Sequence, residues 1–487
     1  MIPTPDLTPI IPEIILVAAA CLVLLVDPFL KLDRTALVAI SITGFLAYGV
    51  SAIALIGREA ASFNDMIVIN DFAIFFKVLF AAAGVMTVLM SPRYLEAYHR
   101  HLGEYYALLL FAVVGMGVMA AARDLIAFYV GLELMAVSSY LLAGFFRYQV
   151  RSNESALKYF LTGTFASAIT LYGISFVYGL SGGTNYAAVG QALLGGENVL
   201  AVAFATALVF AGMGFKVSVA PFHMWTPDVY EGAPTPVAGF FSVGPKAAGF
   251  AAILMLFLTV FEASVETWKM LFIIFSLLTM AVGNLFALVQ RNVKRMLAYS
   301  SIAHVGYLLA GLAAIGQSGE LLAGQAILLY LAAYTFMNLG AFGILAYLKT
   351  QHPLVFDYSL EDMAGLGRRS SLAAVLMSLF LFSLTGIPGT AGFIGKFYLF
   401  NAVVRADLVW LAVIAVIFSA VSAYYYLRVI VYMFFRESEE ELTLYEGISG
   451  SMAASLGLST LGVLFIGILP ASLWDAAVAA FENFVGL

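Results

Sequence analysis

The stretch that decides the fold is GMGFKVSVAPFHMW, which spans residues 212–225. It places a lysine, Lys216, in a long apolar segment beside the helix breaker Pro221. A second stretch, LTGIPGTAGFIGKFYLF at residues 384–400, repeats this combination with Lys396. An amine inside hydrocarbon costs about 2.5–3.5 kcal/mol on insertion scales, so a lysine in this setting is expected to have a task. The two lysines therefore point to a membrane protein that handles protons or ions.

Composition supports a polytopic membrane protein. The chain has 487 residues, of which 63% are hydrophobic and 11% are charged. A soluble domain is about a quarter charged, so most of this chain is expected to face lipid or other helices. The formal net charge of −6 comes with no basic patch, which argues against a nucleic-acid partner.

The residues that usually hold redox cofactors are sparse. Cys21 is the single cysteine, so neither an intrachain disulfide nor an iron–sulfur site can form. The five histidines show no spacing typical of haem or zinc. We therefore expect no cofactor and no metal on this chain.

The apolar segments predict an all-α fold. A spanning helix needs about 20 mostly apolar residues. With that window we expect fourteen transmembrane helices, near residues 10–30, 36–56, 72–90, 104–121, 124–146, 156–180, 199–222, 237–261, 267–289, 297–315, 322–348, 371–402, 408–435 and 450–470.

The basic residues of the loops predict the orientation. Thirteen of the 23 lysines and arginines fall in loops after odd-numbered helices, and four fall in loops after even-numbered helices. Because cytoplasmic loops are enriched in these residues, the first set is expected in the cytoplasm. Both termini would then face the other side, which is the periplasm in a bacterial inner membrane.

The order of the segments predicts four parts: residues 1–103 with the first three helices, repeats at 104–262 and 263–436, and residues 437–487 with the last helix and a tail. Each repeat has five helices, an odd number, so the second is expected to be inverted. The seventh and twelfth helices are broken by Gly and Pro at matching positions, which is a sequence pointer to an ion site in transporters. The alternative is that these residues only kink ordinary helices.

Glu133 is the most plausible partner of Lys216. It lies near the middle of the fifth predicted helix, in the sequence VGLELMAV. A nearby carboxylate stabilises an ammonium and burial opposes it, so a change at Glu133 could release a proton from Lys216. The alternative is a static ion pair that fixes helix packing, although such pairs contribute little to stability. No carboxylate partner is evident for Lys396.

Four further residues are candidates for the same chemistry. Lys246 follows Pro245 in the eighth predicted helix, and His304 has serine and tyrosine neighbours in the tenth. His223 lies seven residues after Lys216. Lys158 is near the cytoplasmic end of its helix, where it could instead extend to the interface. For His304 the alternative is a structural histidine.

Three motifs resemble one known family. They are WTPDVYEGAPTPV at 225–237, QRNVKRMLAYSSIAHVGY at 290–307 and SLTGIPGTAGFIGKFYLF at 383–400. Together with the length, they resemble the antiporter-like membrane subunits of respiratory complex I (NADH:quinone oxidoreductase), most closely the subunit N family. The resemblance covers essentially the whole chain.

The resemblance implies proton translocation. By position, Glu133, Lys216, Lys246 and Lys396 match the family's proton path, with Lys158, His223 and His304 in supporting roles. Flavin, iron–sulfur clusters and quinone are expected on other subunits. Expected partners are subunit M and the small subunits K, J and A, in the bilayer of a bacterial inner membrane. The rivals are a subunit of a multisubunit sodium/proton antiporter and a scaffold subunit whose charges only pack.

Overall fold

The computed structural model describes residues 6–30, 34–98, 103–195, 198–319, 321–437 and 447–486. These residues form helices and one antiparallel hairpin, in which β1 (Ala60–Ser62) pairs with β2 (Ile67–Ile69). The helices are α1 (Ile11–Leu30), α2 (Arg34–Ile53), α3 (Asp71–Ala97), α4 (Gly103–Ala121), α5 (Leu125–Ala143), α6 (Val150–Ser181), α7 (Tyr186–Leu194), α8 (Val199–Val217), α9 (Trp225–Gly232), α10 (Thr235–Met255), α11 (Val265–Val289), α12 (Val293–Ser318), α13 (Leu321–Gln351), α14 (Leu360–Met363), α15 (Leu366–Arg369), α16 (Ser371–Thr385), α17 (Ala391–Arg405), α18 (Val409–Phe435), α19 (Gly450–Ile468) and α20 (Ala471–Val485). Three irregular turns are η1 (Thr8–Ile10), η2 (Leu256–Val260) and η3 (Glu262–Ser264).

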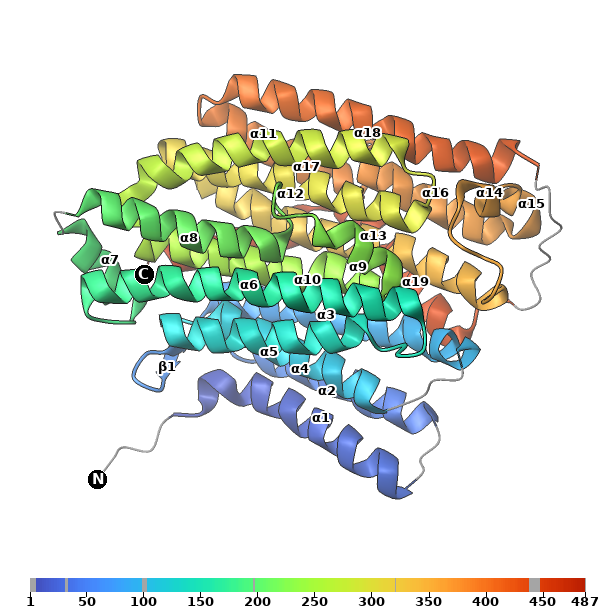
Figure 1. Ribbon diagram of the computed structural model, residues 1–487, viewed down its shortest axis with the longest axis horizontal. Coiled ribbons are helices and arrows are strands. Elements are labelled where there is room, and N and C mark those ends of the chain that lie inside the picture. Colours follow the sequence, from blue (N-terminus) through green and yellow to red (C-terminus); the bar gives the residue numbers. More distant parts are fainter. Residues whose placement is uncertain are drawn as a thin grey trace.

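The long helices lie side by side along one direction (Figure 1). The short helix α7 lies at the left-hand end of this bundle, and α14 and α15 lie at the right-hand end. We call these the α7 end and the α14 end. α1 begins at the α7 end, and the last turn of α20 lies against α7 there. The loops that join α5 to α6 and α11 to α12 lie at the α14 end.

Thirteen helices of the described residues are long and apolar enough to cross a membrane. They correspond to thirteen of the fourteen predicted segments. The remaining segment, predicted at 371–402, is divided into α16 and α17, of 15 residues each. Each half is too short to cross a bilayer alone. The membrane fold is confirmed, whereas the count of fourteen and the inverted repeat stay predictions.

Both interruptions occur where the sequence places helix-breaking residues. α8 ends before Ser218, which has a φ of +70°. α16 ends before Gly386 and Gly389, whose φ angles are +93° and +86°. Glycine adopts this left-handed conformation without steric cost, and Pro388 between them has no N–H to continue a helix. The chain therefore turns at both places inside the bundle.

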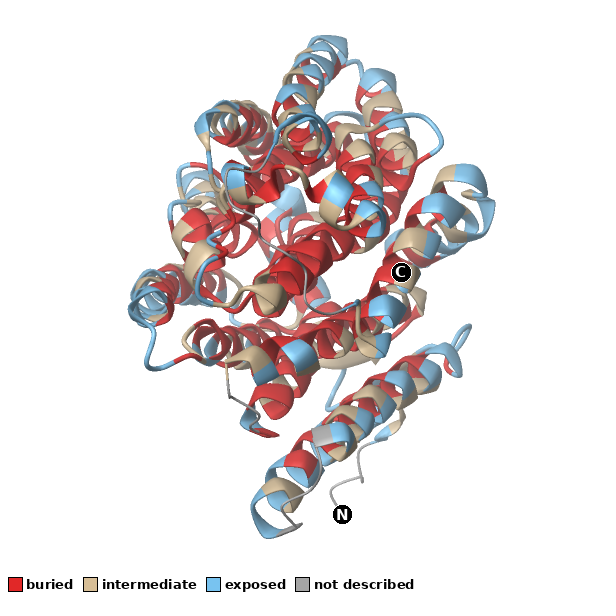
Figure 2. Cartoon of the chain, turned by 90° about the vertical axis from the view of Figure 1, so that its right-hand side faces the viewer, coloured by how far each residue is buried: buried red, intermediate tan, exposed pale blue. Residues whose placement is uncertain are grey.

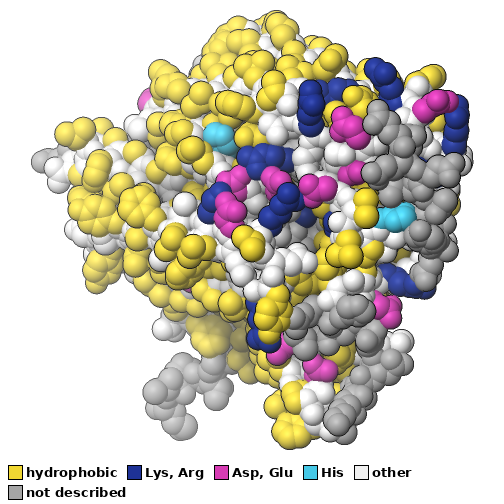
Figure 3. Space-filling view, turned by 45° about the vertical axis from the view of Figure 1, so that its right-hand side comes forward, with side chains coloured by type: hydrophobic (Ala, Val, Ile, Leu, Met, Phe, Trp, Pro, Cys, Tyr) yellow, Lys and Arg dark blue, Asp and Glu magenta, His cyan; other side chains and the backbone are white. Residues whose placement is uncertain are grey.

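The outside of the bundle is apolar. Figure 2 shows buried residues toward the centre and exposed residues on the outer faces of the peripheral helices. Many exposed residues are large and hydrophobic, such as Phe165 and Leu461, with 70% and 66% of their surface exposed. Figure 3 shows acidic and basic side chains gathered in small groups toward one side of a largely hydrophobic face. Such a surface fits lipid and partner helices.

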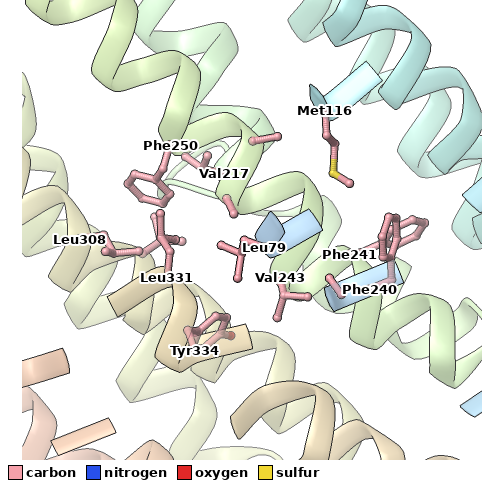
Figure 4. Close-up of a cluster of buried hydrophobic side chains, with 14 of the residues drawn as sticks. Leu79, Met116, Val217, Phe240, Phe241, Val243, Phe250, Leu308, Leu331 and Tyr334 are labelled. Carbon is pink, nitrogen blue, oxygen red and sulfur yellow. The ribbon is translucent and has the colours of Figure 1, made fainter. Parts of the chain in front are cut away.

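The centre of the bundle is built around α10, every residue of which is buried. Its side chains meet apolar residues of α3, α4, α8, α12 and α13 (Figure 4). A Cβ at Gly249 would lie 2.4 Å from Val217, so glycine lets α10 pack closely against the end of α8. This contact places the end of α8, the first interrupted helix, against α10 at the centre of the bundle.

The tail after Pro470 forms α20. Its Phe484 ring stacks on Phe72 of α3, with ring centroids 4.7 Å apart. Phe481 packs against Gly324 of α13, and a Cβ on this glycine would overlap the Phe481 ring. The tail is therefore docked on both α3 and α13.

Candidate functional site

Lys216 lies in the last turn of α8, immediately before the interruption. Its side chain is buried, and its Nζ donates hydrogen bonds to Ser167 Oγ at 3.1 Å and to the Tyr140 hydroxyl at 3.3 Å. These partners come from α6 and α5. A Cβ on Gly163 would lie 2.2 Å from the Tyr140 hydroxyl, so glycine makes room for it. The amine is held by hydroxyl groups.

Glu133 lies seven residues before Tyr140 on α5 and therefore on the same helix face, about 10 Å along the axis. Its Oε1 is buried and has no hydrogen-bond partner among the described residues. No ion pair of 4 Å or less joins Glu133 to Lys216 in that part of the chain. The predicted pairing stays a prediction, and any influence of this carboxylate acts over a distance or through intervening groups.

Lys246 lies in the middle of α10 and is 3% exposed. Its Nζ donates to Ser301 Oγ of α12 at 2.7 Å and lies 5.7 Å from the centre of the Tyr230 ring. No hydrogen bond joins Lys246 to Lys216 within the described chain. Val217, which follows Lys216, packs on Gly249, which lies three residues after Lys246. The candidate path therefore has a gap between the two amines in the described chain.

A second group of polar side chains lies beside Ser301 on α12. Ser300 hydrogen bonds to the Tyr426 hydroxyl, which lies 3.2 Å from His304 Nε2. The other ring nitrogen, His304 Nδ1, lies 2.5 Å from the Tyr330 hydroxyl. His304 is thus the centre of a buried network that links α12, α13 and α18. Sequence reasoning found the serines beside His304 but missed the two tyrosines, because they come from distant helices.

Lys396 lies in α17, on the far side of the second interruption. Its buried Nζ donates to the carbonyl oxygens of Leu384 and Thr385 and to Ser419 Oγ, each at 2.9 Å. Its stem passes Gly386, where a Cβ would lie 3.1 Å from Lys396 Cδ. The ammonium therefore caps the C-terminal end of α16, where carbonyl groups carry a partial negative charge.

Lys396 also lies near the His304 network on one side and near the outer surface of the bundle on the other. Its Nζ lies 5.4 Å from the centre of the Tyr307 ring, and that ring lies 5.7 Å from the His304 ring. On the other side, Lys396 lines a groove of about 720 Å³ between α17 and α18. This lysine therefore connects the interior of the second half with its outer face.

Lys158 lies outside this buried line. Its side chain is 43% exposed, and it forms ion pairs with Glu154 at 2.6 Å and Asp228 at 2.8 Å. Arg295 joins Asp228 at 2.8 Å and Glu231 at 2.7 Å. Lys158 thus belongs to a network of charges, in line with the predicted alternative of an extended side chain.

His223 lies in the connection between α8 and α9. It is half-buried, and its Nδ1 has no hydrogen-bond partner in the described part of the chain. A buried ring nitrogen of this kind is commonly satisfied by water. The structure places His223 near the interruption of α8, and its role stays a prediction.

Two further buried cations have partners that the sequence does not reveal. Lys294 lies in the first turn of α12, where its Nζ donates to the Glu231 and Ala233 carbonyls at 3.1 and 2.6 Å. Lys77 of α3 forms a buried ion pair with Glu13 of α1 at 2.9 Å. Neither contact has a local signal, because both join residues that are distant in the sequence.

The described residues contain no group of three or more His, Cys, Asp or Glu side chains that could hold a metal ion. The site consists of buried amines, hydroxyls, an imidazole and a carboxylate. These groups can bind, hold and transfer protons.

Comparisons with known proteins agree with this chemistry. Residues 122–422 match the family described as NADH:quinone oxidoreductase/Mrp antiporter, TM. The chain is 45% identical to NADH-quinone oxidoreductase subunit N of Trichlorobacter lovleyi, with 98% of each chain covered.

Solved structures show the same fold. A chain of respiratory complex I from Thermus thermophilus with bound aureothin is 32% identical, with a TM-score of 0.81 over 96% of this chain and 100% of that one. A chain of the Mrp complex from a Dietzia species has a TM-score of 0.82 over 98% of this chain and 97% of that one, but its 21% identity shows the fold alone. The chain therefore belongs to the subunit N family of NADH-quinone oxidoreductases, within the membrane family that these enzymes share with Mrp antiporters.

Proposed function

We propose that Glu133, Lys216, Lys246 and Lys396 carry protons through this chain, which is a proton-translocating membrane subunit of NADH-quinone oxidoreductase. One observation carries the assignment of residues. Three buried lysines bind hydroxyl or carbonyl oxygens, and none forms an ion pair with a carboxylate in the described chain. A buried amine without a fixed counter-ion can exist with or without its proton, which a transfer site requires.

The proposed path runs from the first interruption to the second. A change of charge at Glu133 alters the proton affinity of Lys216, and the proton passes to Lys246. It then moves along the hydroxyls and the imidazole around His304 to Lys396. Transfer between Lys216 and Lys246 needs a bridging group such as water, because the two amines have separate hydrogen-bond partners in the described chain. This gap is therefore the proposed point of control.

The reaction that drives this transfer is assigned to other subunits. We propose that flavin, iron–sulfur clusters and quinone lie on those subunits. Subunits M, K, J and A are the proposed neighbours, and the groove at Lys396 is one surface open to contact. The proposed location is a bacterial inner membrane, with the α14 end in the cytoplasm.

Because the chain shares its fold with a chain of the Mrp complex, one alternative function stays open, a subunit of a sodium/proton antiporter. The higher identity to subunit N over nearly the whole chain favours the quinone reductase. Purification of the native assembly separates the two. Flavin and iron–sulfur subunits should copurify with this chain, and their absence would favour the antiporter.

The residue assignment is tested by Glu133→Ala and Lys216→Ala in the assembled complex. We expect proton pumping by reconstituted vesicles to fall at least about tenfold, in line with the usual contribution of a proton-transfer group. Lys269→Ala is the matched control, because among the described residues Lys269 pairs with the exposed Glu266 one turn away and with no residue of the proposed path. Normal pumping by both assembled variants would contradict the assignment.

A further inference from the structure

A second polar site lies at the α7 end, away from the proton path. A crevice of about 490 Å³ separates α7 from the starts of α11 and α13 and from the end of α20. Its volume is in the range of small-molecule sites. None of the residues assigned to the proton path lines it.

The wall of the crevice presents two buried polar atoms that lack a partner. Arg123, between α4 and α5, has a buried Nη2 without a hydrogen-bond acceptor in the described chain. The hydroxyl of Tyr186, whose side chain is 1% exposed, is likewise without a partner. Both groups can donate, and an unsatisfied buried donor destabilises the fold unless a ligand or water meets it.

The backbone holds these two donors in a fixed relation. The Tyr186 N–H donates to the Arg123 carbonyl at 2.9 Å, and the Arg123 N–H donates to the Met66 carbonyl at 2.9 Å. The guanidinium also lies 5.8 Å from the centre of the Phe484 ring. The pair is therefore a preorganised site for an acceptor.

The charges in the crevice specify the chemistry of that acceptor. Burial lowers the pKa of Arg123 from its ordinary value, and it raises the pKa of Tyr186 well above its ordinary value, so the hydroxyl keeps its proton to donate. A cation at the wall repels hydronium and attracts an anion, which argues against a proton exit here. Glu262 lines the same crevice and could accept hydrogen bonds from an amine.

The rim of the crevice is apolar. Leu194, Leu321 and Val485 line it and are 56%, 43% and 47% exposed. Arg123 itself lies between the ends of two spanning helices, which is the level of lipid headgroups. A free inorganic anion gains nothing from exposed leucine and valine, whereas an acyl chain does.

We propose that this crevice binds a phospholipid with a primary amine, such as phosphatidylethanolamine. Its phosphate accepts hydrogen bonds from Arg123 Nη2 and the Tyr186 hydroxyl, its ammonium faces Glu262, and an acyl chain follows the apolar rim. The lipid would join α7 of the first half to α13 and α20. This inference does not depend on proton translocation.

The test uses the purified whole complex and phosphatidylethanolamine with a photoreactive acyl chain. Peptides from α7 should be labelled. Arg123→Gln should lower this labelling about tenfold, as loss of a charge-assisted hydrogen bond predicts, and Tyr186→Phe about threefold. Tyr178→Phe is the matched control, because this exposed tyrosine of α6 is not part of the crevice.

Tyr186→Phe keeps the test decisive if Arg123→Gln fails to assemble. It removes a hydroxyl without a protein partner, so a purely structural tyrosine would leave labelling and stability unchanged. Labelling of Tyr186→Phe equal to wild type would overturn the proposal. Displacement of the probe by inorganic phosphate would also overturn it, because the site would then take a free anion.

A second probe tests the amine. Photoreactive phosphatidylglycerol, which lacks an amine, should label α7 more weakly than phosphatidylethanolamine. Glu262→Gln should reduce labelling by phosphatidylethanolamine and leave that by phosphatidylglycerol unchanged. Equal labelling by the two lipids in the wild-type complex would overturn the assignment of the ammonium to Glu262.

Discussion

Lys216 and Lys396 both lie at interruptions of membrane helices, yet their amines meet different groups. Lys216 donates to two hydroxyls, which can also donate in return. Lys396 donates to two carbonyl oxygens and one hydroxyl. A neutral amine could donate to the two carbonyls and accept from Ser419, so both sites can hold an ammonium or a neutral amine, but Lys396 has one neighbour that can donate to it where Lys216 has two.

The two lysines also differ in their position relative to the break. Lys216 precedes the interruption in the last turn of α8, and Lys396 follows it in α17. A repeat keeps the order of residues along the chain whether or not it is inverted, so the two lysines do not take equivalent places relative to the break. They also differ in their contacts: Lys216 meets hydroxyls of neighbouring helices, and Lys396 reaches back to the carbonyls that end the preceding helix segment.

The largest expected effect compares Lys396→Met with Lys216→Met. Both should lower proton pumping at least about tenfold. Only Lys396→Met should also destabilise the assembled complex, by about 1–3 kcal/mol for each carbonyl left without a donor. Thermal unfolding of the purified complexes measures this difference. Equal destabilisation by the two substitutions would contradict the proposed difference between the two lysine sites.

His304→Phe tests whether the network in the second half connects Lys246 to Lys396. Phenylalanine keeps the aromatic packing and removes the hydrogen bonds to Tyr330 and Tyr426. We expect pumping to fall about fivefold, because a shared network is worth more than one bond. Tyr299→Phe serves as a control on the same helix. Unchanged pumping in His304→Phe would place the path elsewhere.

A smaller effect on proton pumping is expected when the hydroxyl groups that contact the two lysines are removed one at a time. Tyr140→Phe removes one of the two acceptors of Lys216 and should lower pumping about threefold, the equivalent of one neutral hydrogen bond. Ser419→Ala leaves Lys396 with both carbonyls, so it should have less effect. Rates of proton uptake by matched vesicles measure both variants. A larger loss of pumping in Ser419→Ala than in Tyr140→Phe would contradict this expectation.

The smallest effect is expected for Lys158→Met. This lysine is partly exposed in a charge network, and exposed ion pairs contribute about 0–1 kcal/mol. Pumping and thermal stability should stay close to wild type. A loss of pumping as large as that of Lys216→Met would show that the proton path includes this network.

The sequence predicts the helices and the buried amines because both have local signals. Spans of about 20 apolar residues locate the helices, and a lysine inside one is conspicuous. The positions of Lys216 and Lys396 beside Gly and Pro also predict both interruptions.

The partners of these groups had no such signal. Ser419 at Lys396, and Tyr330 and Tyr426 at His304, come from other helices, so only the packed bundle brings them together. For the same reason the sequence, which offered no carboxylate partner for Lys396, did not reveal that helix-end carbonyls receive its amine.

The most direct test of the account is the number of protons pumped per NADH oxidised by reconstituted complex that carries Lys246→Met. Lys246 lies in α10, between the two interrupted helices in chain order, and its partner Ser301 is the neighbour of Ser300 in the His304 network. The account predicts an assembled complex with a lower ratio than wild type. An assembled complex with the wild-type ratio would contradict the claim that these buried amines carry protons.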